Sequence, residues 1–166
     1  MTATYEKIAT TTITTNTASY TFSSIPSTYT DLVLIMGNVN NTDASQTLMQ
    51  FNSDTGSNYS RTALDGNGSS ASSVRNTSQT AIMLEYAGYP SFDGSKNYTG
   101  IWNIMNYANS TTYKTVIGRG SSASTGVVAS VGLWRSTSAI TSLKIQPAYG
   151  NSFTNATLTL YGIKAE

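Results

Sequence analysis

Residues 30–39 read TDLVLIMGNV, and this stretch decides which fold the sequence can form. Its apolar side chains run consecutively from Leu32 to Met36 instead of alternating with polar ones. A strand that is apolar on both faces must be covered on both faces. We therefore expect a second sheet on one side of this strand. The other side is expected to be covered either by loops of the same chain or by a neighbouring subunit.

The rest of the chain is rich in β-branched and aromatic residues and shows little helical periodicity. The clearest alternation is near the C-terminus, where Leu158 and Leu160 fall on one face and the threonines between them on the other. Strands are expected at residues 5–15, 18–23, 30–39, 46–52, 59–64, 81–86, 98–107, 113–118, 127–134, 140–146 and 156–163.

Short polar segments separate these strands. Asp65-Gly66, Asp93-Gly94 and the GSSAS stretch at 120–124 are expected to be turns. Short strands divided by such turns predict an all-β fold, an antiparallel β-sandwich of the jelly-roll type. We expect a single domain over residues 1–166. Residues 1–4, or on a wider definition residues up to about 15, are expected to form an N-terminal arm.

The composition excludes several classes of function. Charged residues make up only 10% of the chain, against about 25% in ordinary domains, and the net charge is +1. The nine basic residues are scattered, so neither nucleic-acid binding nor attraction to a membrane is expected. The chain has no Cys and no His, which removes thiolate nucleophiles, the Ser-His-Asp triad and the commonest transition-metal ligand.

The N-terminal residues MTATYEKIATTT do not read as a secretory signal, and no apolar run approaches 18 residues. We therefore expect synthesis in the cytoplasm without a signal peptide.

The stretch FNSDTGSNYS at 51–60 has two interpretations. Its Asn52, Asp54 and Asn58 could gather oxygens around a cation, or they could turn the chain between two strands of a hairpin. A calcium loop would also need an acidic ligand downstream, and no Glu lies between Glu6 and Glu85. The turn interpretation is therefore favoured, and Asp65 and Asp93 are assigned to turns in the same way.

Catalysis has one candidate, a glycosidase built from Glu85 and an Asp. The eight acidic residues form no recognisable pair, so we expect no enzyme, no catalytic residue, no cofactor and no metal. Tyr, Trp and Asn side chains on a sandwich face could instead bind a sugar, although such residues more often fill or decorate a β core.

Several segments taken together resemble virion structural proteins of tailed bacteriophages, in which similar blocks occur in the same order in small β-sandwich domains. The segments are SYTFSSIPSTYTDLVLI (19–35), FNSDTGSNYS (51–60), LDGNGSS (64–70), VGLWRSTSAITSLKI (131–145) and LTLYGIK (158–164). Each block is weakly specific alone, and their ordered combination is more specific. The resemblance brings no catalytic motif.

The resemblance implies one of two roles. A self-contained sandwich without a repetitive shaft suits a capsid decoration or cement protein, which binds the major capsid protein on the exterior of the virion, as a homotrimer. The alternative is a tail-fibre or receptor-binding appendage domain that recognises glycans on the host surface.

Overall fold

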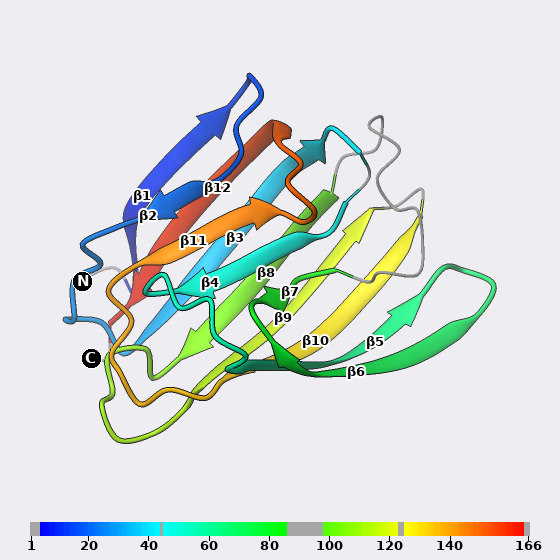
Figure 1. The fold of residues 1–166 in the computed structure, drawn as a ribbon. Coiled ribbons are helices and arrows are strands. Elements are labelled where there is room, and N and C mark those ends of the chain that lie inside the picture. Colours follow the sequence, from blue (N-terminus) through cyan, green and yellow to red (C-terminus); the bar gives the residue numbers. More distant parts are fainter. Residues whose placement is uncertain (1–3, 44, 86–97, 123–124, 165–166) are drawn as a thin grey trace.

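A computed structural model describes residues 4–43, 45–85, 98–122 and 125–164, and all the regular secondary structure in these ranges is β-strand (Figure 1). The strands are β1 (Tyr5–Ile13), β2 (Tyr20–Phe22), β3 (Asp31–Asn41), β4 (Thr47–Phe51), β5 (Tyr59–Gly66), β6 (Ala71–Gln79), β7 (Ile82–Met83), β8 (Tyr98–Met105), β9 (Lys114–Ser122), β10 (Gly126–Trp134), β11 (Leu143–Pro147) and β12 (Phe153–Ile163).

The strands form two packed antiparallel sheets, so the expected all-β sandwich is confirmed. The large sheet has eight strands in the order β1-β12-β3-β8-β9-β10-β5-β6, and the small sheet has four in the order β2-β11-β4-β7. Four strand pairs nest along the sequence: β1 with β12, β2 with β11, β3 with β8, and β4 with β7. Alternate pairs share a sheet, which is the winding of a jelly roll.

Two inserted hairpins enlarge only one of the two sheets. The β5–β6 hairpin lies in sequence between β4 and β7, and the β9–β10 hairpin lies between β8 and β11. Both add to the large sheet beside β8, so it reaches well past the edge of the small sheet (Figure 1). Half of the large sheet is therefore an extension of the eight-strand jelly-roll frame.

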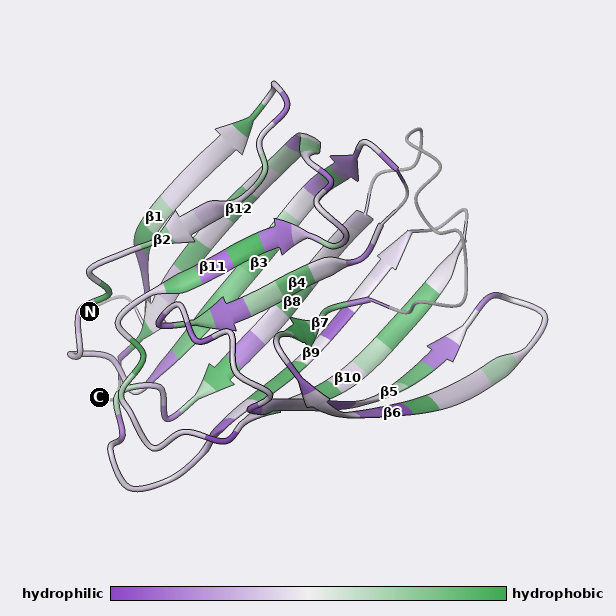
Figure 2. Ribbon diagram, viewed as in Figure 1, coloured by the Kyte–Doolittle hydropathy of each residue, from purple (hydrophilic) through white to green (hydrophobic). Residues whose placement is uncertain are grey.

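The core lies between the two sheets, and its position accounts for the run of apolar side chains at 30–39. Leu32, Leu34 and Met36 of β3 are fully buried and belong to one apolar cluster with residues of both sheets. Figure 2 shows hydrophobic residues, in green, on strands of both sheets. On the opposite face of β3, Val33 is also buried but Ile35 is 38% exposed. The small sheet thus supplies the first expected cover, and the described residues leave the outward face at Ile35 open.

Large aromatic side chains cover the inner face of the extension, and glycines make room for them. Trp102 of β8 is fully buried and lies against Gly118 of β9, where an added Cβ would come within 2.0 Å of the indole Cδ1 atom. Tyr98 covers Gly120 in the same way. The glycines in GRG at 118–120 are therefore required by close packing across neighbouring strands.

Some of the expected boundaries were wrong. Asp65-Gly66 is not a turn, because β5 continues through Gly66 and Asp65 pairs with Val128 and with Ser72. The turn follows at 67–70, where the side chain of Asn67 accepts hydrogen bonds from the backbone N–H groups of Ser69 and Ser70.

β9 likewise continues to Ser122, into the stretch expected to be a turn, and residues 123–124 lie outside the described residues. The expected turn at Asp93-Gly94 also lies outside them.

One strand was missed and one connection was misassigned. β6 reads ASSVRNTSQ, a polar edge strand whose two aliphatic side chains, Ala71 and Val74, give no alternating pattern. The stretch 51–60 does connect two strands through a turn, but it is not a hairpin. β4 belongs to the small sheet and β5 to the large one, so residues 52–58 carry the chain from one sheet to the other.

Residues 5–13 form β1, which pairs with β12 along its length and makes one edge of the large sheet. This segment is therefore part of the sandwich instead of the wider N-terminal arm that was expected. Of the shorter arm, residues 1–3 lie outside the described residues.

Candidate functional site

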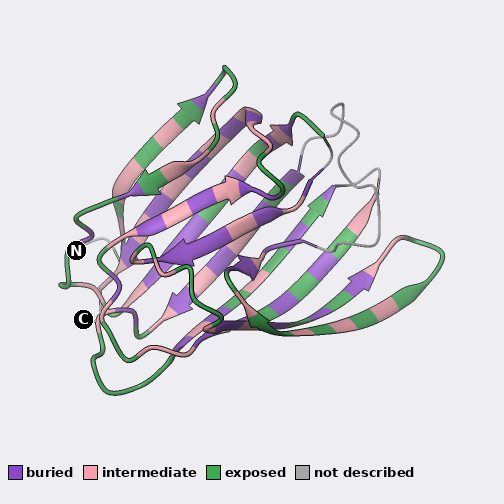
Figure 3. Cartoon of the chain, viewed as in Figure 1, coloured by how far each residue is buried: buried purple, intermediate pink, exposed green. Residues whose placement is uncertain are grey.

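The outward face of the large sheet carries five exposed aliphatic side chains. They are Ile35 on β3, Leu64 on β5, Ile117 on β9, and Val127 and Val131 on β10, with exposed fractions of 38, 64, 48, 62 and 49%. We call these five residues the apolar sheet face. Along β9 and β10 buried and outward positions alternate, so these side chains point away from the core (Figure 3).

Strand register makes the apolar sheet face continuous. Ile117 lies opposite Val131, and Leu64 lies opposite Ala129 on the neighbouring strand. Two shallow hollows of about 310 and 270 Å³ open on this face, the first lined by Ile35 and Val127 and the second by the other three residues. Exposed apolar surface gathered on one face in this way is typical of protein interaction sites.

The apolar sheet face has very little charge. Among the outward positions of β8, β9, β10 and β5, Arg119 is the only charged side chain, and it lies between Ile101 and Ala129 in register. On the neighbouring β6, exposed Arg75 lies opposite Thr62 of the second hollow. A partner surface that is mostly apolar and places one acceptor opposite Arg119 would match this arrangement. Sequence reasoning found only the β3 part of the face, because the threonines and glycines on the other strands obscure the pattern.

A buried polar cluster lies on the opposite, inner side of β5. The alternation in this strand places Arg61 and Asp65 on the same face as buried Tyr59, and both are at most 5% exposed. Arg61 donates through one guanidinium nitrogen to the main-chain oxygens of Met83, at 2.9 Å, and of Glu85. Sequence reasoning missed this cluster. The available signal was the spacing of Tyr59, Arg61 and Asp65 in YSRTALDG, which places all three side chains on one face of a strand.

The Glu85 carboxyl is buried in the same cluster. One oxygen accepts a 2.5 Å hydrogen bond from the backbone N–H of Thr47, and the other has no partner within the residues that the structure describes. Burial raises the pKa of Glu85 to about 7, although the Thr47 bond and the charge of Arg61 lower it. Burial also raises the pKa of Asp65, again partly offset by Arg61.

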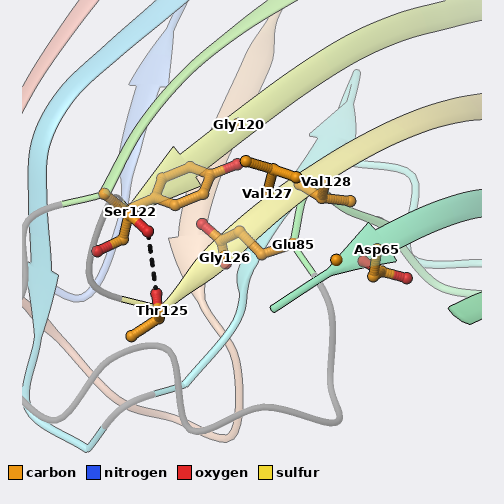
Figure 4. A pocket seen from close by; sticks show the side chains of 10 residues that line it. Asp65, Glu85, Gly120, Ser122, Thr125, Gly126, Val127 and Val128 are labelled. Atoms are coloured by element: carbon orange, nitrogen blue, oxygen red, sulfur yellow. Dashed lines mark hydrogen bonds between the residues drawn. The ribbon is translucent and has the colours of Figure 1, made fainter. Parts of the chain in front are cut away.

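Glu85, the carboxylate considered for a glycosidase, lines one small cavity with Asp65, Ser122 and Val128 (Figure 4). The cavity has a volume of about 30 Å³. That space admits one or two water molecules and is too small for a sugar ring. The structure therefore brings these two carboxyl groups to one place but gives no support to sugar cleavage there.

The polar residues of the 51–60 stretch bond to the protein instead of converging on one point. Asp54 accepts hydrogen bonds from the Gly56 N–H, at 2.8 Å, from the Asn58 amide, at 3.0 Å, and from the Trp134 indole. Asn52 turns the other way and accepts bonds from the backbone N–H groups of Thr141 and Ser142. These bonds show a turn between two strands, as expected, although the connection is not the expected hairpin.

The described ranges contain no group of three His, Cys, Asp or Glu side chains that could hold a metal ion. They also contain no helix long and apolar enough to span a membrane.

The chain was compared with known proteins. No family model and no curated protein sequence matches it.

Proposed function

We propose that this chain is a structural protein of a phage virion, a decoration or cement protein that binds the major capsid protein on the outside of the shell. The ordered sequence blocks that resemble virion proteins support the class of protein. The proposal that it binds the shell through the apolar sheet face rests on the five exposed aliphatic side chains there, because such a surface suits contact with another protein.

The energetics favour many weak contacts over one strong contact. Burying apolar area contributes roughly 25 cal/mol per Å², and association costs several kcal/mol in lost freedom of motion. A single apolar sheet face would therefore bind a capsid with only modest affinity. A homotrimer, which we include in the proposal, would hold three such faces at high effective concentration. With so little charge, binding should depend only weakly on salt.

The experiment uses purified protein and capsids that lack it. The wild-type chain should co-sediment with capsids, and Ile117→Asp and Val131→Asp should abolish or strongly reduce binding, because each would bury an unpaired carboxylate in the contact. Thr21→Asp is the matched control, an exposed strand position on the small sheet that should bind as wild type does.

The same preparations test the alternative role. Binding to host envelope without binding to capsids would overturn the cement role and favour an appendage domain that recognises host glycans. Equal capsid binding by wild type and both aspartate variants would show that another surface makes the contact.

A further inference from the structure

In the described ranges the two sheets end at four edge strands, and three of these carry features that hinder pairing with a further strand. β2 and β7 are only three and two residues long. β1 has adjacent charges at Glu6 and Lys7, and its register with β12 shifts between Lys7 and Ala9. Short length, charge and bulges are the usual means of protecting a sheet edge.

The fourth edge strand, β6, has little of this protection. Its pairing with β5 is regular from Ala71 to Asn76, Arg75 is its only charged side chain, and it contains no Pro. In the part of the chain that the structure describes, β6 forms backbone hydrogen bonds with β5 alone. Figure 1 shows β6 at the free margin of the large sheet. Its outer side therefore presents unpaired N–H and C=O groups to a further strand.

The sequence of β6 matches a second copy of itself. Side chains opposite each other in an antiparallel pair share one face, so a two-fold axis must set one residue opposite its own copy. An axis at Val74 brings the two Val74 side chains together and sets each Ser73 opposite Arg75 of the other copy. The two guanidinium groups are then not opposite each other. An axis at Ser73 would instead set Val74 opposite the polar Ser72, so the axis at Val74 is favoured.

Shape and charge both allow two copies to approach along β6. The β5–β6 hairpin belongs to the extension that reaches past the edge of the small sheet, so the small sheets of two copies stay apart (Figure 1). Each chain has a net charge of only +1, so repulsion between copies is weak. A two-fold axis between neighbouring strands is perpendicular to the sheet, which puts both apolar sheet faces on one side.

We propose that β6 pairs antiparallel with β6 of a second copy, about a two-fold axis at Val74, and joins two large sheets into one continuous sheet. The contact does not depend on capsid binding. It is also separate from the three-fold contact of the proposed homotrimer, so in a trimer it would join one trimer to the next. Because both apolar sheet faces lie on one side of the joined sheet, both copies could contact the same shell.

The chain has no Cys, so a single introduced cysteine reports which strands meet. Val74→Cys should form a disulfide-linked dimer under mild oxidation. Thr11→Cys is the matched control, because both positions are half-buried on edge strands of the large sheet and lie opposite buried residues, Leu158 and Ala63 respectively for Thr11 and Val74. Val74→Cys should crosslink about ten-fold faster or more, because opposite Cα atoms about 4.5–5.5 Å apart suit a disulfide.

The register has its own test. Ser73→Cys mixed with Arg75→Cys should give a crosslinked dimer of the two variants faster than either variant crosslinks with itself. Sedimentation equilibrium adds a measurement without cysteine. The mass of the wild type should rise with concentration, and Val74→Lys should suppress this rise, because two ammonium groups would meet at the axis.

Three outcomes would each overturn the proposal: equal crosslinking rates for Val74→Cys and Thr11→Cys, faster crosslinking of Ser73→Cys than of Val74→Cys, or association that Val74→Lys leaves unchanged. None of these measurements uses capsids. Failure of the strand pairing is therefore distinguishable from failure of the cement role.

Discussion

The indole nitrogen of Trp134 donates a 2.7 Å hydrogen bond to the carboxylate of Asp54, which lies 80 residues earlier in the chain. Trp134 ends β10 in the large sheet, and Asp54 lies in the connection that leaves the small sheet after β4. The tyrosine hydroxyl of Tyr59 donates to the main-chain oxygen of Asp54 at 3.1 Å, and its ring stacks on Trp134. Together these contacts hold the connection between the two sheets in place.

Asp54→Ala should therefore destabilise the fold by about 1–3 kcal/mol, because the mostly buried Trp134 indole loses its acceptor. Burial alone would raise the pKa of Asp54, but the bonds from Trp134, Asn58 and Gly56 lower it below its usual value. The stabilisation is thus present above the unfolded pKa and is lost as the pH falls through the folded one. Urea denaturation of wild type and variant at neutral and acidic pH measures both effects. Equal stability at neutral pH would contradict the assignment.

Asn52→Ala should cost more than a typical exposed turn substitution. Asn52 has φ of 50°, and its side chain bonds the backbone at Ala139, Thr141 and Ser142. The variant loses all three bonds and places Ala in a left-handed conformation, for an expected loss of about 2–4 kcal/mol. Asn109→Ala is the control, because the Asn109 side chain caps an exposed turn within its own loop. A smaller loss at Asn52 than at Asn109 would be inconsistent with a long-range anchor.

Gly118→Ala should destabilise the protein by about 1–3 kcal/mol or more, because the new Cβ would come within 2.0 Å of Trp102 and would force the indole to move. Gly37→Ala is the matched strand control, since a Cβ there would meet nothing within 4 Å. Its effect should stay within about 0.5 kcal/mol. Thermal unfolding of the two variants separates them, and equal losses would indicate a general effect of removing strand glycines.

Glu85 should make stability decrease as the pH rises. Its folded pKa of about 7 exceeds the ordinary value of 4.5, so the folded state holds an extra proton between these limits. The free energy of unfolding should fall by on the order of 3 kcal/mol across this window, with Asp65 contributing in the same direction. Denaturant titrations at about pH 5 and about pH 8 measure the change.

Glu85→Gln should flatten this dependence. Glu6→Gln is the control, because the hydrogen bond from Lys164 lowers the pKa of Glu6, which contributes to the pH dependence with the opposite sign. If the free energy of unfolding of Glu85→Gln still falls with rising pH as in the wild type, the extra proton belongs to another group.

Much of the fold is readable from local patterns. The alternation at Leu158 and Leu160 and the apolar run from Leu32 to Met36 predict strands that require a second layer, because side chains of one strand alternate between two faces. Strand β6 was missed because its pairing depends on backbone hydrogen bonds to β5, which leave no trace in a polar edge sequence. Asp65 was misassigned for a related reason, since Asp-Gly fits a turn and a strand end equally well.

The sequence by itself determined the all-β class, the jelly-roll type and the lack of His and Cys chemistry, because strand periodicity and residue types are local properties. Only the tertiary structure decided which sheet each strand joins and which faces remain open. Those depend on pairings between residues far apart in the chain, such as Leu64 with Ala129 in the strands of the apolar sheet face. That proposed contact surface is a product of strand register, which the order of residues in any one segment does not specify.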